Sequence, residues 1–138
     1  MDKIRVDGMR LVDEFGRERI FSGMNVVDKK DYDVNCPYYG YDPDKFPFEE
    51  FRARGYDIIR LGFTWNAMEP RPQSYNQKLI DDLCKFLDKC EEYGIYAYLD
   101  CHQDVYSSAF YADGAPEWAT ITDNYKPMKP IAVWAEPY

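Results

Sequence analysis

Three short apolar runs recur along the chain. They lie at 20–27, 56–63 and 95–100, and their residues are largely aliphatic and aromatic. Such runs, when they are bounded by glycines, prolines and polar residues, are typical of buried strands. The sequence therefore predicts three strands, with other elements in the intervals between them.

Two of the intervals between the predicted strands are expected to contain a helix. In 77–94, apolar residues recur every three or four positions, which predicts a helix with one buried face. Asn76 is placed as its N-cap and Gly94 as its C-terminal cap. A shorter helix is predicted between Pro47, which suits a first turn, and Gly55. The buried face of the longer helix is expected to comprise Leu79, Leu83, Phe86, Leu87, Cys90 and Tyr93.

The two ends of the chain are expected to differ from this alternating pattern. Residues 9–21 predict a β-hairpin, because two short runs flank 14–17 and Gly16 occupies a position that suits a positive φ. After Trp118 the periodicity stops. The tail at 121–138 is therefore expected to form neither a clear helix nor a fourth strand.

The order of elements predicts the fold class. Strands that alternate with helices form a parallel sheet in an α/β fold. Long polar loops follow the strands, at 28–47, at 64–76 and after 100, whereas the helix-to-strand connections are tight. In a (β/α)8 barrel, the loops that follow the strands build the active face. The pattern predicts the N-terminal part of a TIM barrel, about three of its eight strands, preceded by a β-hairpin.

Composition narrows the possible partners. The chain has 138 residues, of which 46% are hydrophobic, so it can bury a core of one ordinary domain. Its formal net charge of −8 argues against nucleic acid, which requires clustered Lys and Arg. No apolar run approaches the roughly 20 residues of a membrane span. No apolar segment of a secretory signal is visible at the N-terminus.

The cysteines favour a reducing compartment. None of the four forms a Cys-x-x-Cys pair, and three lie in segments that look buried. Free core thiols are therefore expected rather than a disulfide framework or a zinc site, which favours a cytoplasmic location. The cysteines are Cys36, Cys84, Cys90 and Cys101.

The loop after the third predicted strand carries the most candidate chemistry. It contains the single histidine of the chain, His102, followed closely by Asp104. Cys101, which precedes the histidine, would make a poor zinc site with it, because neighbouring strand residues point to opposite faces. Asp113 and Glu117 could pair with Asp104 as catalytic carboxylates, but a role as loop scaffolding is the preferred interpretation.

Three motifs on consecutive strands suggest a family. The segments "FSGMNVV", "RGYDIIRLGFTWNAMEP" and "GIYAYLDCHQDVYSSAFYADGAPEWA" together resemble family 5 glycoside hydrolases, the cellulase-like family, and within it the endoglycoceramidase branch. The resemblance runs from Met9 to Trp118. It implies a barrel that hydrolyses β-glycosidic bonds with retention and uses no cofactor. It also implies that 1–138 is one partial catalytic domain, with strand–helix units over 21–120.

The resemblance implies two catalytic carboxylates that the chain does not supply. Retaining glycosidases need them about 5–5.5 Å apart. The family carries its acid/base in an Asn-Glu-Pro motif after the fourth strand and its nucleophile after the seventh. Neither motif occurs in the 138 residues. Glu69 follows Met68 and comes after the second predicted strand, and Glu136 follows Ala135 in the tail, so neither is assigned as the acid/base.

Supporting residues of such a site can nevertheless be matched. In the family, the residue matching Arg60 hydrogen-bonds near the nucleophile and keeps it ionised, an effect expected of a close opposite charge. The resemblance implies that His102 bonds sugar hydroxyls or neighbouring catalytic groups. Asp104 is expected to accept hydrogen bonds from sugar hydroxyls.

Further substrate contacts are matched less closely. Lys30 lies near the end of the first predicted strand, and Lys29 competes with it for the same role. Trp65 and Trp118 are expected to stack on sugar faces or on lipid chains, or else to be buried in their loops. No metal ligand is assigned.

The sequence thus predicts part of an endoglycoceramidase-like β-glycosidase. Its partner would be a glycolipid or related β-glucoside, and the 138 residues alone are expected to be inactive. Two alternatives stay open: a truncated relative that binds sugars without cleaving them, and a gene fragment with no independent function. The sequence indicates neither the glycan nor the oligomeric state.

Overall fold

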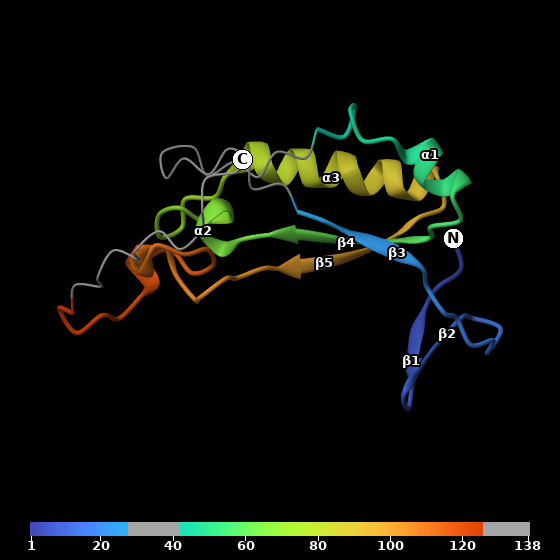
Figure 1. Cartoon of the computed structure of the whole chain (residues 1–138), viewed down its shortest axis with the longest axis horizontal. Helices are drawn as coiled ribbons and strands as arrows, with labels where there is room; N and C mark the ends of the chain where they lie inside the picture. Colours follow the sequence, from blue (N-terminus) through green and yellow to red (C-terminus); the bar gives the residue numbers. More distant parts are fainter. Residues whose placement is uncertain (28–41, 126–138) are drawn as a thin grey trace, which may run out of the picture. The chain divides into compact units, whose positions relative to one another are not determined.

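The computed structural model describes residues 1–27 and 42–125 (Figure 1). The described residues fall into two compact units. One contains 1–26, 42–61 and 82–99, and the other contains 27, 62–81 and 100–125. The strands are β1 (Arg5–Asp7), β2 (Arg10–Val12), β3 (Gly23–Val26), β4 (Ile58–Phe63) and β5 (Tyr96–Cys101). The α-helices are α1 (Phe48–Ala53), α2 (Trp65–Met68) and α3 (Gln77–Glu92).

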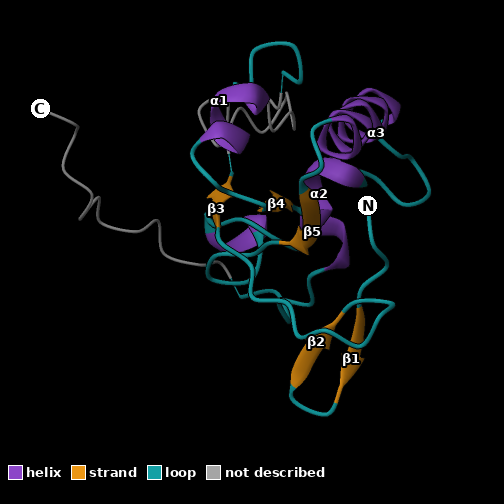
Figure 2. Cartoon of the chain, turned by 90° about the vertical axis from the view of Figure 1, so that its right-hand side faces the viewer, coloured by secondary structure: helices purple, strands orange, loops and turns teal. Residues whose placement is uncertain are grey.

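The three predicted strands form one sheet in the order β3-β4-β5. β3 and β4 are parallel, in a register that runs from Gly23 opposite Ile58 to Val26 opposite Leu61. The parallel pairing and the intervening helices confirm the α/β prediction. β1 and β2 form a separate two-stranded ribbon, drawn apart from the sheet in Figure 2.

The approach of β3 to β4 requires a glycine. A Cβ atom added at Gly23 would lie 1.7 Å from the carbonyl oxygen of Ile58. That separation is far below any tolerated contact, so a side chain at this position would push the strands apart. Gly23 therefore fixes how closely the first two strands of the sheet can pair.

The helices cover one side of the sheet in the first unit (Figure 1). Residues of β4 alternate between faces, as strand geometry requires: Ile59 and Leu61 are fully buried, while Arg60 is only half-buried. Phe86 of α3 is also fully buried, and its ring centroid lies 4.9 Å from that of Phe48. An aromatic cluster thus forms much of the core of this unit.

The predicted helix boundaries are confirmed. The Leu79 amide donates to Oδ1 of Asn76 at 3.2 Å, which is the expected N-cap. Gly55 and Gly94, with φ of 87° and 66°, end α1 and α3 in the left-handed conformation. On the predicted apolar face of α3, four side chains are buried, while Leu87 and Tyr93 are half-buried. The buried four are Leu79, Leu83, Phe86 and Cys90.

The predicted hairpin is displaced toward the N-terminus. β1 pairs with β2 across a turn at Gly8, with φ of 61°, so the ladder lies earlier than the expected 9–21. The expected turn does form, and Gly16 has the predicted positive φ, 77°. The segment after this turn, however, forms only an isolated bridge, between Val12 and Glu18.

Asp13 holds the turn that forms at 13–17. Its fully buried carboxylate accepts hydrogen bonds from the backbone amides of Phe15 and Arg17, at 3.0 and 2.9 Å. It also accepts from Nε of Arg17 at 2.7 Å. Side-chain bonds of this kind compete with strand pairing for the same amides. Burial raises the pKa of Asp13, but the hydrogen bonds from Arg17 and Phe15 outweigh burial and lower it from its ordinary value.

The expectation of buried thiols holds for only one of the three described cysteines. Cys84, Cys90 and Cys101 are all free, but only Cys90 is buried, and burial raises its pKa to about 12. Cys36 lies outside the described residues. Across 1–27 and 42–125, no helix combines the length and apolar character that crossing a membrane requires.

Truncating Phe86 tests the aromatic core. Phe86→Ala should lower the free energy of unfolding by about 3–5 kcal/mol, because it leaves a cavity beside Phe46 and Phe48. Urea unfolding provides the measurement. Lys85→Ala, an exposed neighbour on the same helix, should change stability by less than about 0.5 kcal/mol. Equal losses in the two variants would contradict this placement of the core.

Asp13→Asn tests the carboxylate near the hairpin. Since folding lowers the pKa, the ionised Asp13 stabilises the fold above the unfolded pKa of about 3.9. That contribution is lost as the pH falls through the folded pKa. We expect the variant to be less stable than the wild type at neutral pH, and the difference to shrink below about pH 4 in urea unfolding. A difference that is unchanged in acid would count against the role assigned to Asp13.

Candidate functional site

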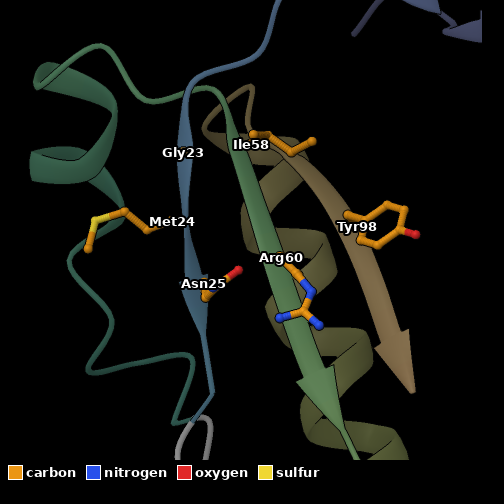
Figure 3. A pocket seen from close by; sticks show the side chains of 6 residues that line it. All are labelled: Gly23, Met24, Asn25, Ile58, Arg60 and Tyr98. Carbon is orange, nitrogen blue, oxygen red and sulfur yellow. The ribbon is translucent and has the colours of Figure 1, made fainter. Parts of the chain in front are cut away.

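Arg60 lies on the sheet face opposite the buried residues of β4. It lines a cavity of about 350 Å³ in the first unit, together with residues of all three strands (Figure 3). Figure 3 shows Asn25 of β3 directed toward the Arg60 side, whereas Met24 points away. Asn25 is the register partner of Arg60, so the parallel pairing itself brings these two polar residues together. The lining residues are Gly23, Met24, Asn25, Ile58, Arg60 and Tyr98.

His102 and Asp104 meet in the second unit, directly after β5. Nε2 of His102 lies 3.4 Å from Oδ2 of Asp104. On its other side, Nδ1 of His102 lies 3.1 Å from Oδ2 of Asp100. The histidine side chain is 20% exposed, so an approaching ligand can reach it. These groups form a cluster of hydrogen-bonding atoms at the carboxyl end of a parallel strand, where α/β enzymes place their sites.

Backbone hydrogen bonds hold the cluster in place. The His102 amide donates to the carbonyl oxygen of Phe63 at 2.6 Å, which continues the sheet pairing one residue past β5. Asp104 and Asp113 exchange two backbone bonds, each 3.1 Å long. Between these anchors, Val105 has a φ of 55°, an uncommon conformation for a β-branched residue. Such strain concentrates at functional loops.

Trp65 and Trp118 pack against each other in the same unit. Their ring centroids lie 5.6 Å apart at an angle of 82°. Both indole N–H groups donate to Glu69: Trp65 to the carboxylate at 2.9 Å, and Trp118 to the backbone oxygen at 3.1 Å. The indoles are 39% and 41% exposed, so part of each ring stays open to a ligand.

Glu69 has a structural role in this arrangement. Its second carboxylate oxygen accepts from the Gln73 amide at 2.8 Å. The residues before Glu69 form α2, a short helix within a segment predicted to be a loop. Thr64 is its N-cap and accepts from the Ala67 amide at 3.4 Å. The hydrogen bonds from Trp65, Gln73 and Trp118 thus give Glu69 a structural role.

Gly62 packs closely against Val27 and lies next to the Asp100–His102 pair. A Cβ atom at Gly62 would lie 2.8 Å from Cγ2 of Val27, and 3.7 Å from both Oδ2 of Asp100 and Cβ of His102. The first separation is too short for a real contact, whereas 3.7 Å is an ordinary van der Waals distance. A side chain at this position would therefore displace Val27.

The structure places the candidate site residues in both units. His102 and Asp104 lie next to each other in the second unit, whereas Arg60 belongs to the first. Lys30, Lys29 and Glu136 lie outside the described residues. Within 1–27 and 42–125, no group of three or more His, Cys, Asp or Glu side chains could hold a metal ion.

Asp100 was not anticipated, although the sequence contains a signal for it. It precedes His102 by two positions, and residues two apart in an extended chain share a face. Asn25 and Tyr98 beside Arg60 were also missed. The signal for Asn25 would have been strand register, which hydrophobic pattern alone leaves open in so short a strand.

Comparison with known proteins identifies the family. The family model "Cellulase (glycosyl hydrolase family 5)" matches residues 12–135. In structure, an endogalactoceramidase superposes with a TM-score of 0.71 and 25% identity. The partial sheet described above is thus part of a (β/α)8 barrel of the kind found in these enzymes. The chain belongs to glycosyl hydrolase family 5.

Within the family, the similarity extends to endoglycoceramidases. An endoglycoceramidase of Cyanea nozakii is 36% identical over 128 residues, and one of Hydra vulgaris is 34% identical over 119 residues. Endo-glycoceramidase II from Rhodococcus sp., in its ganglioside GM3 complex, superposes with a TM-score of 0.64 and 28% identity, covering 91% of this chain and 30% of that one. The endogalactoceramidase match covers 91% and 32%.

The two curated relatives are much longer than this chain. The matches cover 88% and 84% of the chain but only 24% and 23% of the Cyanea and Hydra enzymes. The chain therefore spans about a quarter of the length of these relatives. The comparisons therefore concern only the part of these relatives that the chain matches.

Substituting Gly62 tests its close packing against Val27. Gly62→Ala should lower the free energy of unfolding by about 1–3 kcal/mol, because the added methyl group overpacks against Val27. Val27→Ala removes the clashing methyl group. The double variant should therefore lose less stability than the two single changes added together. Strict additivity in urea unfolding would show that the two positions do not interact.

Proposed function

We propose that this chain supplies the substrate-contacting part of a retaining β-glycosidase of the endoglycoceramidase type. The enzyme would hydrolyse O-glycosyl bonds of glycosphingolipids or related β-glucosides. Membership in glycosyl hydrolase family 5 supports the reaction class. The names of the Cyanea and Hydra relatives, and the ganglioside complex of the Rhodococcus enzyme, support the substrate class.

One observation carries the proposal: His102 and Asp104 lie side by side at the carboxyl end of β5. Their facing atoms, Nε2 and Oδ2, are 3.4 Å apart, and the Asp104 side chain is 54% exposed. Sugar hydroxyls donate and accept hydrogen bonds, and a carboxylate next to an imidazole can engage two of them. Charge-assisted bonds of this kind are stronger than neutral ones.

The remaining matched residues fit this function in different ways. Arg60 would hydrogen-bond near the nucleophile and favour its ionised form. Trp65 and Trp118 keep open ring surface and have already used their N–H groups within the protein, which suits stacking on the apolar face of a sugar or on a lipid chain. Lys30 would add a contact from the loop after β3.

Bond cleavage needs two carboxylates that we place outside the 138 residues. The chain lacks the Asn-Glu-Pro motif of the family. Glu69, one of the two glutamates that precede a proline, accepts hydrogen bonds from the Trp65 indole and the Gln73 amide. Residues 1–138 would thus form one part of a catalytic domain, in which they position substrate for groups supplied elsewhere.

Binding without cleavage is the expected behaviour of the 138-residue chain. Titration with octyl β-glucoside should show saturable binding, and Asp104→Ala should weaken it about tenfold, the equivalent of about 1.4 kcal/mol. Glu117→Ala is the matched control, because Glu117 is an exposed acid in the same loop and lies outside the His102–Asp104 cluster. It should leave the affinity unchanged.

Two results would count against the proposed function. One is the absence of any saturable binding of the glucoside by the folded chain. The other is equal weakening by Asp104→Ala and Glu117→Ala, which would indicate a general charge effect. Release of glucose from the glucoside by the 138-residue chain would instead refute the placement of both carboxylates outside it.

A further inference from the structure

His102 lies between two carboxylates, and its two ring nitrogens face different ones. Nδ1 is 3.1 Å from Oδ2 of Asp100, and Nε2 is 3.4 Å from Oδ2 of Asp104. A neutral imidazole carries one ring proton, so one nitrogen donates and the other accepts. The position of that proton decides what His102 offers to a ligand.

Distance and burial both favour the proton on Nδ1. The 3.1 Å separation from Asp100 falls within the usual 2.7–3.2 Å range for N–H···O bonds, whereas 3.4 Å does not. The Asp100 side chain is 19% exposed and that of Asp104 is 54% exposed. A carboxylate with less access to water depends more on protein donors. Asp100 is therefore the better acceptor for the single ring proton.

We propose that Asp100 is a positioning residue that fixes His102 as the Nδ1–H tautomer. The hydrogen bond that one ring nitrogen makes determines the role of the other. Nε2 then presents a lone pair next to Oδ2 of Asp104, so the cluster offers two acceptors 3.4 Å apart. Such a pair suits hydroxyl donors, and the identification of those donors as sugar hydroxyls rests on the proposed function.

The backbone around the pair is arranged to hold this geometry. The 2.6 Å hydrogen bond from the His102 amide to the Phe63 carbonyl oxygen fixes the backbone position of His102. Gly62 lies beside the pair, since a Cβ added there would be in ordinary van der Waals contact, 3.7 Å, with both Oδ2 of Asp100 and Cβ of His102. Asp104 is held independently by its backbone exchange with Asp113. The acceptor pair is thus formed before any ligand binds.

Nitrogen NMR of the single histidine tests the proposal directly. The full chain, labelled with ¹⁵N-histidine, is titrated to the high-pH plateau of the ring signals, where the neutral form is observed. In the wild type, Nδ1 should show the signal of a protonated nitrogen and Nε2 that of a bare one. A predominant Nε2–H tautomer in the wild type would overturn the proposal, even if every variant failed to fold.

Two matched variants separate Asp100 from Asp104. In Asp100→Asn, the amide can donate to Nδ1, so the Nε2–H tautomer should increase and Asp104 should become its acceptor. Asp104→Asn should keep the wild-type tautomer. An unchanged tautomer in Asp100→Asn, or a switch in Asp104→Asn, would contradict the assignment of Asp100.

Sugar binding distinguishes this inference from the proposed function. If Asp100 sets the acceptor pair, Asp100→Asn should bind octyl β-glucoside about tenfold more weakly than the wild type, in step with its change of tautomer. A wild type with the Nδ1–H tautomer but no glucoside binding would refute the proposed function and leave the tautomer assignment intact. Unaltered glucoside affinity in a variant whose tautomer has switched would refute the role of the tautomer in binding.

Discussion

The close parallel pairing of β3 with β4 is the constraint on which the described sheet depends. A Cβ at Gly23 would overlap the Ile58 carbonyl oxygen, at 1.7 Å, so only glycine allows this approach. The resulting register places Asn25 beside Arg60 and leaves Ile59 and Leu61 for the helix-covered face. The close approach at Gly23 and the alternation of residues along β4 together separate the buried face of the first unit from its polar face.

In the proposed function, the second unit would hold the ligand, and groups elsewhere would react with it. The groups with a direct hydrogen-bonding role, His102 and Asp104, are placed by backbone bonds to Phe63 and Asp113. Glu69, which precedes a proline but was not assigned as the acid/base, anchors two indoles and a turn. The cluster is suited to orienting hydroxyl groups, whereas glycosidic bond cleavage needs a carboxylate pair.

The sequence predicted secondary structure best where apolar residues recur at a regular spacing and form a buried face. The 16 residues of α3 and their caps could be predicted because apolar spacing, Asn76 and Gly94 all indicate the same helix. The position of the hairpin could not, because β2 pairs with β1 across Gly8, while the carboxylate of Asp13 holds 13–17 as a turn. The pairing of Asp100 with His102 was missed because it depends on side-chain distances at a strand end, which no hydrophobic period encodes.

The central claim, that His102 and Asp104 hold a sugar, is tested most directly by mapping amide chemical shifts during titration with a β-glucoside. The account predicts that the largest changes centre on these two residues and on the loop that follows them. When octyl β-glucoside is the ligand, 1-octanol is the control, because it shares the alkyl chain but lacks the sugar. It should not reproduce those changes. Largest changes on the β1-β2 hairpin, or the same pattern with the alcohol alone, would contradict it.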